Sequence, residues 1–542
     1  MNHGGSMASH KCPPHDDVPN SSATTLIDSQ KFVLRFFPSL TDLAFLAPAV
    51  LLFSLMGGTK TLLSDGDPGW HIRTGDWILQ NGRIPHTDLF SFTKAGQPWF
   101  AFGWLWDVLF AWIHQHGGMA AVLAVSTFVL CLTFALLFRV VRSQCGNDFI
   151  AIGVTMLAVA GSSLHFVARP HLFTLLFAVI LYSVLERTQT SGGRWLFTVP
   201  VLVLMWANLH AGFLAGIIII GAFACGRLIR FLVAPQAEDA RLALIDFYRN
   251  SLLAAACVLA ALVNPYGYHL LVHIYSFLTD PFTLRNVAEY QVVDFRTPAG
   301  RCFEVMLVLG AIAAFVRIQR KDFGHVLLFG IWAHLALTSQ RHIPIFMIIA
   351  APSVAFALHE MLIAIRRAPV AGWIRRVASD IDRSAAEFAS NDRIERFHVV
   401  SAAAMILLFL VLRSPGAPPK FRAEFDRQEY PEGAVAAFIK LGPSAKVFTT
   451  DLWGGYLTYR LYPSVRIFVD GRIDFYGSDY GRTVLDVLAG KDTWEKTFQR
   501  YGINAALVPV NVPLAAVLKQ SERWRRVYAD GKVIVFRQVA VS

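Results

Sequence analysis

Long apolar stretches alternate with short polar ones along most of this chain. Several apolar runs, among them 119–140, 211–232 and 343–362, reach the roughly 17 to 25 residues that a helix needs to cross the hydrocarbon core of a bilayer. The pattern predicts eleven membrane-spanning helices, centred near residues 50, 129, 157, 177, 202, 221, 257, 310, 331, 352 and 405. It therefore predicts a polytopic integral membrane protein with an α-helical bundle.

The composition agrees with this prediction. Hydrophobic residues make up 55% of the chain and charged residues 16%, which is outside the range of ordinary soluble domains. The formal net charge of +11 could suggest a nucleic-acid partner, but the Lys and Arg residues lie mainly in short loops between the predicted spans. The positive-inside rule accounts for that distribution, so no nucleic-acid partner is expected and the lipid bilayer is the predicted environment.

The basic loops also predict the orientation of the chain. Placing these loops in the cytoplasm puts the N-terminus inside, with residues 1–40 as a disordered tail, and puts the residues after about 414 outside the inner membrane, in the periplasm. This requires the aromatic segment 99–114, which carries Asp107, to lie at the membrane interface rather than to span. The loops in question contain Arg139 and Arg142, Arg187 and Arg194, Arg227 to Arg249, Arg317 to Lys321, and Arg366 to Arg396.

The last part of the chain differs from the rest. After the linker 414–419, strand-like runs at 445–449, 465–470, 505–510 and 532–537 are separated by helical patterns at 432–441 and 493–501. Alternation of this kind is typical of α/β structure. The predicted domains are therefore the tail 1–40, a membrane domain 41–413 with a long first outer loop 60–118, and a small α/β domain 420–542 on the outer face.

Candidate chemistry begins in loop 60–118. Asp65 and Asp67 stand two residues apart among Gly and Pro residues. Such a pair suits a divalent metal ion such as Mg²⁺ or Mn²⁺, or a general base acting on an acceptor group. The alternative is a polar turn that caps an interfacial helix over 69–79.

Charged and polar residues also recur in the turns that the topology places outside. Arg at the outer end of a span runs against the orientation rule, and its planar guanidinium is well suited to pair with phosphate. The alternative is snorkelling to the interface or ion pairing within the bundle. The candidate substrate-binding residues in these turns are Arg169, His171, His210, Asp294, Arg296, Arg341 and His342.

Two stretches resemble a known family. Residues 65–75 follow the pattern Asp-x-Asp-Pro-x-Trp-His-x-Arg-x-Gly and resemble the first outer loop of the catalytic subunit of oligosaccharyltransferase and its archaeal relatives, which belong to the GT-C class of membrane glycosyltransferases. Residues 446–456 (KVFTTDLWGGY), followed by Arg466 and by 469–471 (VDG), look like the neighbourhood of that family's Trp-Trp-Asp-Tyr-Gly motif. The Trp-Trp pair is absent here, so the resemblance does not imply recognition of an Asn-x-Ser/Thr acceptor.

The resemblance implies a GT-C-like bundle and a function closest to that of bacterial cell-envelope glycosyltransferases. Such an enzyme would transfer a sugar from a polyprenyl-phosphate or pyrophosphate donor to an unknown acceptor at the outer face. Asp67, supported by Asp65, would hold metal or take the acceptor proton, Arg169, His171, Arg341 and His342 would offset charge on the leaving phosphate, and Trp453 is a further substrate-binding candidate. The alternatives are an envelope polysaccharide polymerase or ligase, and a non-enzymatic transporter or scaffold.

Overall fold

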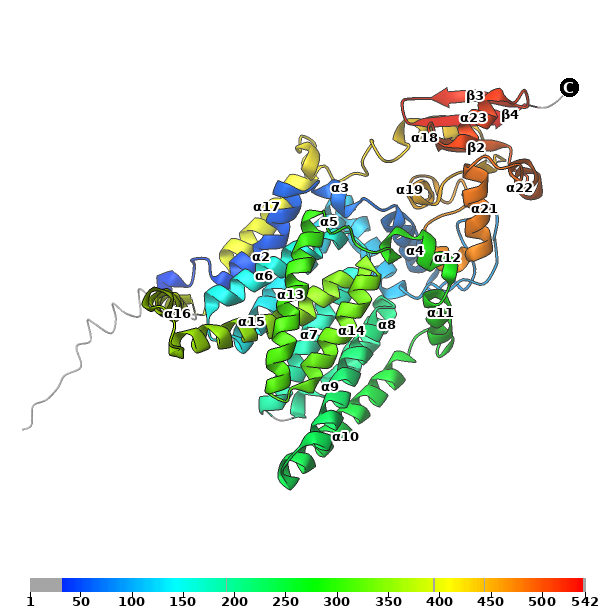
Figure 1. Cartoon of the computed structure of the whole chain (residues 1–542). Coiled ribbons are helices and arrows are strands. Elements are labelled where there is room, and N and C mark those ends of the chain that lie inside the picture. Colours follow the sequence, from blue (N-terminus) through cyan, green and yellow to red (C-terminus); the bar gives the residue numbers. More distant parts are fainter. Residues whose placement is uncertain (1–31, 192, 393–394, 443, 540–542) are drawn as a thin grey trace, which may run out of the picture.

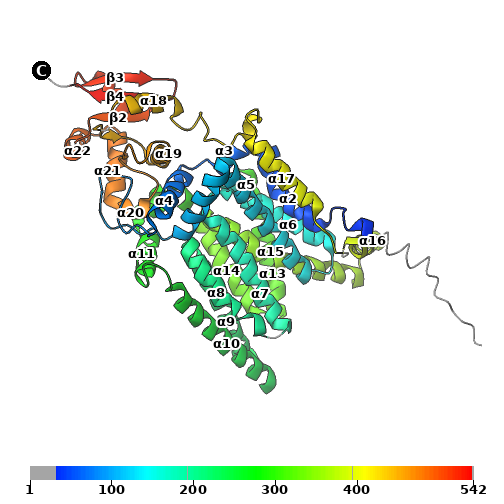
Figure 2. The same cartoon turned by 180° about the vertical axis from the view of Figure 1, so that it is seen from behind.

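The computed structural model describes residues 32–191, 193–392, 395–442 and 444–539. Most of the predicted N-terminal tail, residues 1–31, lies outside this part. The described chain forms a bundle of long helices and, at one end of the bundle, a small domain built around a sheet (Figures 1 and 2). The predicted combination of a helical membrane bundle and a C-terminal α/β domain is confirmed.

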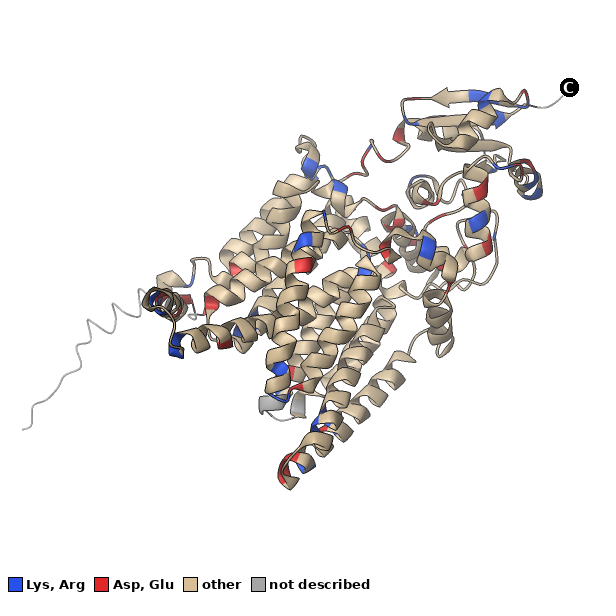
Figure 3. Cartoon of the chain, viewed as in Figure 1, with Lys and Arg blue, Asp and Glu red and all other residues tan. Residues whose placement is uncertain are grey.

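Seven helices in the described part of the chain are long and apolar enough to cross a membrane. Four more of the predicted spans form shorter apolar helices, so the predicted number of eleven spans is not confirmed and stays a prediction. Charged residues gather at the two ends of the bundle and leave its middle almost free of them (Figure 3). The long helices are α5 (Trp104–Gln144), α6 (Asp148–Ser162), α7 (His171–Ser191), α9 (Phe213–Val233), α10 (Ala237–Ala261), α13 (Pro298–Gln319) and α15 (Ile343–Arg367), and the shorter ones are α2 (Leu40–Val50, continued by Leu51–Leu55), α8 (Thr198–Leu209), α14 (Phe323–Thr338) and α17 (Val399–Arg413).

Local sequence fixes where these helices begin and how closely they pack. The side chain of Asn147 accepts hydrogen bonds from two backbone N–H groups at the start of α6, and Thr297 caps α13 ahead of a proline at its first turn, an arrangement that satisfies otherwise unpaired N–H groups. Between α9 and α14, Gly226 lies directly on the backbone of Gly324. Small residues allow this approach because no side chain separates the two helices.

The aromatic segment of loop 60–118 is helical. It forms the first limb of α5, which is interrupted at Gly118, where φ is 64°, a conformation that glycine adopts without strain. This limb packs against helix α4 (Asp67–Asn81). The buried carboxylate of Asp107 lies 2.5 Å from Nδ1 of His71 and thereby joins α5 to α4.

The C-terminal domain contains a four-stranded sheet in the order β1-β2-β4-β3. Strand β1 (Val447–Phe448) is parallel to β2 (Ala505–Pro509), and β4 (Val533–Gln538) is antiparallel to both β2 and β3 (Trp524–Ala529). The predicted helices at 432–441 and 493–501 correspond to α18 (Glu432–Lys440) and α22 (Trp494–Tyr501). The helices α19 (Asp451–Leu461), α20 (Ile473–Tyr476), α21 (Ser478–Leu488) and α23 (Pro513–Gln520) complete the domain.

One predicted strand is wrong and one strand was missed. Residues 465–470 do not join the sheet, because their backbone pairs with loop 60–118 instead: the N–H of Ile467 donates to the carbonyl of Phe90, and the N–H of Phe92 donates to the carbonyl of Ile467, both at 3.0 Å. The missed strand, β3, has a largely exposed face and two adjacent arginines, which hide the strand pattern. The exchange of partners ties loop 60–118 to the C-terminal domain.

Candidate functional site

The two predicted carboxylates converge on Arg169. Asp65 lies just before α4 and Asp67 begins it, whereas Arg169 precedes α7 more than a hundred residues later. Nη1 of Arg169 is 2.7 Å from Oδ2 of Asp65, and Nη2 is 3.3 Å from Oδ2 of Asp67. Oδ1 of Asp65 also accepts the backbone N–H of Asp67 at 3.0 Å. Asp65 therefore accepts a backbone N–H at the start of α4, and both carboxyl groups face the same charged partner.

Asp67 is buried and closely enclosed. Its Oδ1 accepts a hydrogen bond of 2.9 Å from the indole Nε1–H of Trp70, and Gly471 leaves room for the carboxylate on another side. Burial is the main reason that the pKa of Asp67 is raised to about 8, and the negative charge of Asp65 adds to this effect, although Arg169 and Trp70 oppose it. A carboxyl group with such a pKa gains or loses a proton near neutral pH, as a general acid or base must.

A third carboxylate, Glu289, meets the same guanidinium. Glu289 pairs with Nη1 of Arg169, and its other oxygen lies 3.9 Å from Nε2 of His165. Burial by itself would raise the pKa of Glu289, but the positive charges of Arg169 and Arg341 outweigh burial and hold that pKa well below its ordinary value. At neutral pH the site thus contains one firmly ionised carboxylate, Glu289, beside one that titrates, Asp67.

Arg341 reaches this region from a different segment of the chain. It precedes α15, donates a hydrogen bond to the hydroxyl group of Tyr290, and lies 4.6 Å above the centre of that ring. The turn before it is fixed to the Glu289 loop, because the hydroxyl of Ser339 donates to the carbonyl of Glu289 at 3.1 Å. Arg169 and Arg341 are therefore held by neighbouring residues of one segment, Glu289 and Tyr290.

The predicted histidines lie around these arginines. His171 hydrogen-bonds through Nε2 to the carbonyl of His165 at 2.8 Å. Nδ1 of His210 lies 2.8 Å from the hydroxyl of Thr174, and burial, followed by the charges of Arg341 and Arg169, lowers the pKa of His210 to about 3. His210 is therefore neutral at physiological pH.

The remaining predicted residues lie in other surroundings. His342 follows Arg341, with its ring 6.2 Å from that of Trp332. Asp294 and Arg296 are exposed in the turn before α13, where the side chain of Asp294 accepts the backbone N–H of Arg296 at 2.9 Å. Trp453 is buried and donates its indole N–H to the carbonyl of Glu429 at 2.9 Å. Within the described residues, neither Asp294 nor Arg296 nor Trp453 bonds to the Asp67–Arg169 group.

The second family-like stretch lies against the first through glycines. A Cβ atom added at Gly66 or Gly69 would come inside 3.0 Å of the backbone of α19, and one added at Gly454 or Gly455 would clash in the same way with Val469 or Gly66. In addition, Nε of Arg73 donates to the carbonyl of Tyr459 at 2.9 Å. Residues about 390 positions apart therefore form one wall of the site.

The oxygen ligands of this site suit a hard divalent cation, because Mg²⁺ and Mn²⁺ prefer carboxylate oxygens. In this structure all three carboxyl groups lie against the single guanidinium of Arg169. Among the described residues, no group of three or more His, Cys, Asp or Glu side chains is arranged to hold a metal ion. Asp65, Asp67 and Glu289 fit such an ion by ligand type, provided that Arg169 moves away.

Three members of the site, Glu289, Trp70 and Gly471, are not among the residues that the sequence selects for it. Trp70 follows Asp67 by one helical turn inside the family-like pattern, so its spacing could have revealed it. Gly471 belongs to the second family-like stretch, but only the fold places it on Asp67. Glu289 shares its loop with other acidic residues, and nothing in the sequence distinguishes it from them.

No family model and no curated protein matches this chain. Among solved structures it is similar to the oligosaccharyltransferase of Archaeoglobus fulgidus in the apo form, with 12% identity and a TM-score of 0.52 over 87% of this chain and 69% of that chain. The complex of the A. fulgidus enzyme AglB with an inhibitory peptide and dolichol-phosphate gives 11% identity and a TM-score of 0.51, with the same coverage of both chains.

A third similar structure is ArnT from Cupriavidus metallidurans, with 15% identity and a TM-score of 0.46 over 96% of this chain and 99% of that chain. The similarity to the archaeal enzymes shows that this chain shares the fold of the A. fulgidus oligosaccharyltransferase. The predicted GT-C-like fold is thereby confirmed.

Proposed function

We propose that this protein is a membrane glycosyltransferase that takes a sugar from a polyprenyl-phosphate or pyrophosphate donor. The observation that carries the proposal is the convergence of Asp65, Asp67 and Glu289 on Arg169, with Arg341 nearby, at one end of a helical bundle. An oligosaccharyltransferase-like fold provides the setting, and the complex of AglB with dolichol-phosphate supports a lipid-linked donor. The polyprenyl chain stays between the helices while its phosphate head group reaches the charged end.

The reaction follows from the charges of the site. An acceptor nucleophile forms a bond to the anomeric carbon, the bond from that carbon to the phosphate oxygen breaks, and the electron pair leaves with the lipid phosphate. Asp67 takes the proton of the acceptor, and Arg169 and Arg341 stabilise the negative charge that develops on the leaving phosphate.

A divalent cation is part of this proposal. Asp65, Asp67 and Glu289 would hold it, and it would supply positive charge to offset the phosphate group. The A. fulgidus oligosaccharyltransferase has also been solved as a complex with Zn and sulfate, which supports a metal in this fold. Orientation belongs to the proposal as well: the site and the C-terminal domain face the periplasm, with the N-terminus in the cytoplasm.

The test is incubation of the purified full chain with a panel of radiolabelled polyprenyl-phosphate sugars, measuring loss of label from the lipid fraction. We expect label transfer with at least one donor and none with Asp67→Asn. Asp479→Asn is the matched control, since its side chain is fully exposed on α21. A protein that folds but releases label from no donor, or an Asp67→Asn variant with full turnover, would contradict the proposal.

A further inference from the structure

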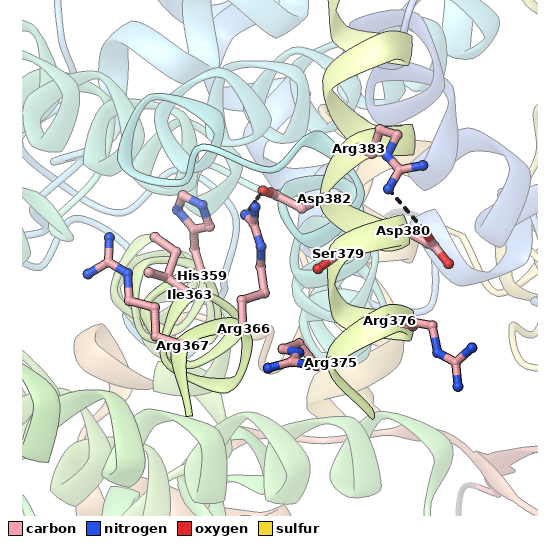
Figure 4. A pocket seen from close by; sticks show the side chains of 10 residues that line it. All are labelled: His359, Ile363, Arg366, Arg367, Arg375, Arg376, Ser379, Asp380, Asp382 and Arg383. Atoms are coloured by element: carbon pink, nitrogen blue, oxygen red, sulfur yellow. Dashed lines mark hydrogen bonds and ion pairs between the residues drawn. The ribbon is translucent and has the colours of Figure 1, made fainter. Parts of the chain in front are cut away.

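Helix α16 (Gly372–Asp392) lies at the end of the bundle opposite the C-terminal domain (Figures 1 and 2). It follows α15 after a short turn and packs on α15 and α6. Figure 4 shows the last turns of α15 nearly end on, with α16 crossing beside them. A helix that crosses the end of a spanning helix in this way lies along the membrane surface rather than through it.

Three kinds of residue divide the circumference of α16. Small alanines, Ala378, Ala385 and Ala389, are buried against the bundle. Beside them runs a stripe of large apolar side chains, spaced so that they share one helical face. Their exposed fractions are 64% for Trp373, 50% for Val377, 40% for Ile381 and 45% for Phe388. A soluble surface helix would not leave such a stripe uncovered, whereas a helix lying in the interfacial zone of a bilayer buries it in lipid.

The polar side of α16 and the end of α15 enclose a pocket of about 610 Å³. Two acidic residues of this pocket are paired: Arg366 with Asp382, and Arg383 with Asp380 at 3.5 Å. These pairs are the dashed contacts in Figure 4. The other three arginines of the pocket, Arg367, Arg375 and Arg376, have no carboxylate partner within the described part of the chain. The charged lining consists of Arg366, Arg367, Arg375, Arg376, Arg383, Asp380 and Asp382.

We propose that this pocket binds the phosphate head group of an anionic phospholipid whose acyl chains lie along the Trp373–Phe388 stripe. Both parts of a phospholipid then have a binding surface. The unpaired guanidinium groups bind the phosphate, and the adjoining apolar face of α16 contacts the acyl chains. A free phosphate ion would use only the pocket and leave the stripe exposed. The site is separate from the Asp67–Arg169 group and does not depend on the proposed glycosyl transfer.

The experiment is a thermal-shift titration of the purified full chain in detergent, with phosphatidylglycerol compared with phosphatidylcholine. We expect phosphatidylglycerol to stabilise the protein at an at least roughly tenfold lower concentration, since each basic residue near an anionic surface contributes about fivefold before screening. The triple variant Arg367→Gln, Arg375→Gln and Arg376→Gln should lose this preference, and the same positions changed to Lys should keep most of it.

The matched control removes three exposed arginines from the C-terminal domain, Arg523→Gln, Arg525→Gln and Arg526→Gln, and should bind phosphatidylglycerol like the unaltered chain. A photoreactive acyl-chain lipid should label residues 373–388, which tests the proposal on the unaltered chain even if the triple Gln variant fails to fold. Unchanged lipid preference in the folded Gln variant, absence of label on α16, or equal stabilisation by inorganic phosphate would each overturn the proposal.

Discussion

The contact between Gly471 and Asp67 offers a direct perturbation of the candidate site. A methyl group added at Gly471 would come well inside 3.0 Å of Oδ1 of Asp67, closer than real Cβ atoms approach. The backbone of Gly471 does not adopt a positive φ, so alanine is conformationally allowed there. The effect of Gly471→Ala must therefore arise from steric overlap with the carboxylate.

The size of the effect follows from the enclosure of Asp67. Trp70 holds the same oxygen at 2.9 Å, and the carboxylate is buried, so relief of the overlap requires a shift of about 1 Å. Misplacement by this distance can lower a reaction rate about a hundredfold, whereas overpacking costs roughly 1 to 3 kcal/mol of stability. We expect the turnover number to fall far more than the affinity for the donor.

The assay is steady-state transfer from the best polyprenyl-phosphate sugar, with Tm measured on the same preparations. Gly531→Ala is the matched control, because a methyl group there meets nothing within 4 Å in the same domain. A Gly471→Ala variant that turns over as fast as Gly531→Ala, with Tm close to that of the unaltered chain, would show that this contact does not position Asp67.

Three further predictions concern charge and orientation. The pKa of Asp67 is raised from 3.8 to about 8 in the folded protein, so the folded state binds more protons than the unfolded state between these pH values. The free energy of unfolding should therefore fall as pH rises from about 4 to about 8. Asp67→Asn should reduce this pH dependence in urea titrations, and an unchanged pH profile would contradict the prediction. Arg169→Lys and Arg341→Lys should weaken donor binding and the Ala variants should weaken it more, by about tenfold to a hundredfold, since a charged hydrogen bond contributes roughly 1.5 to 3 kcal/mol; unchanged donor affinity with lower Tm would assign both arginines to structure alone. An alkaline phosphatase fusion near residue 420 should be active, and an inactive fusion together with an active cytoplasmic reporter at the same site would reverse the predicted orientation.

Local sequence patterns predict those parts of the fold, such as the membrane helices, that depend only on whether a segment lies in lipid or in water. Apolar runs indicate helices whatever their neighbours are, because every backbone polar group must be paired within the segment in lipid. The number of spans is harder to predict, because an apolar run does not fix the length of the helix that it forms. Helix α8 has only 12 residues and α17 only 15, so both are apolar but shorter than a helix that crosses a bilayer. The prediction that residues 465–470 form a strand of the sheet is wrong, because the composition of a segment does not indicate its pairing partner. That partner is loop 60–118.

The candidate site divides in the same way. Asp65 and Asp67 are neighbours in sequence, so their spacing alone suggested shared chemistry, and the positions of Arg169 and Arg341 against the orientation rule suggested a partner for each. Only the tertiary structure could select Glu289, which lies 120 residues beyond Arg169 and pairs with it, and only the tertiary structure could place Gly471 against Asp67. The local sequence indicates whether a segment lies in water, in lipid or at the end of a helix. Which charged side chains meet is decided by the packing of helices and loops, because those contacts join segments that are far apart in the sequence.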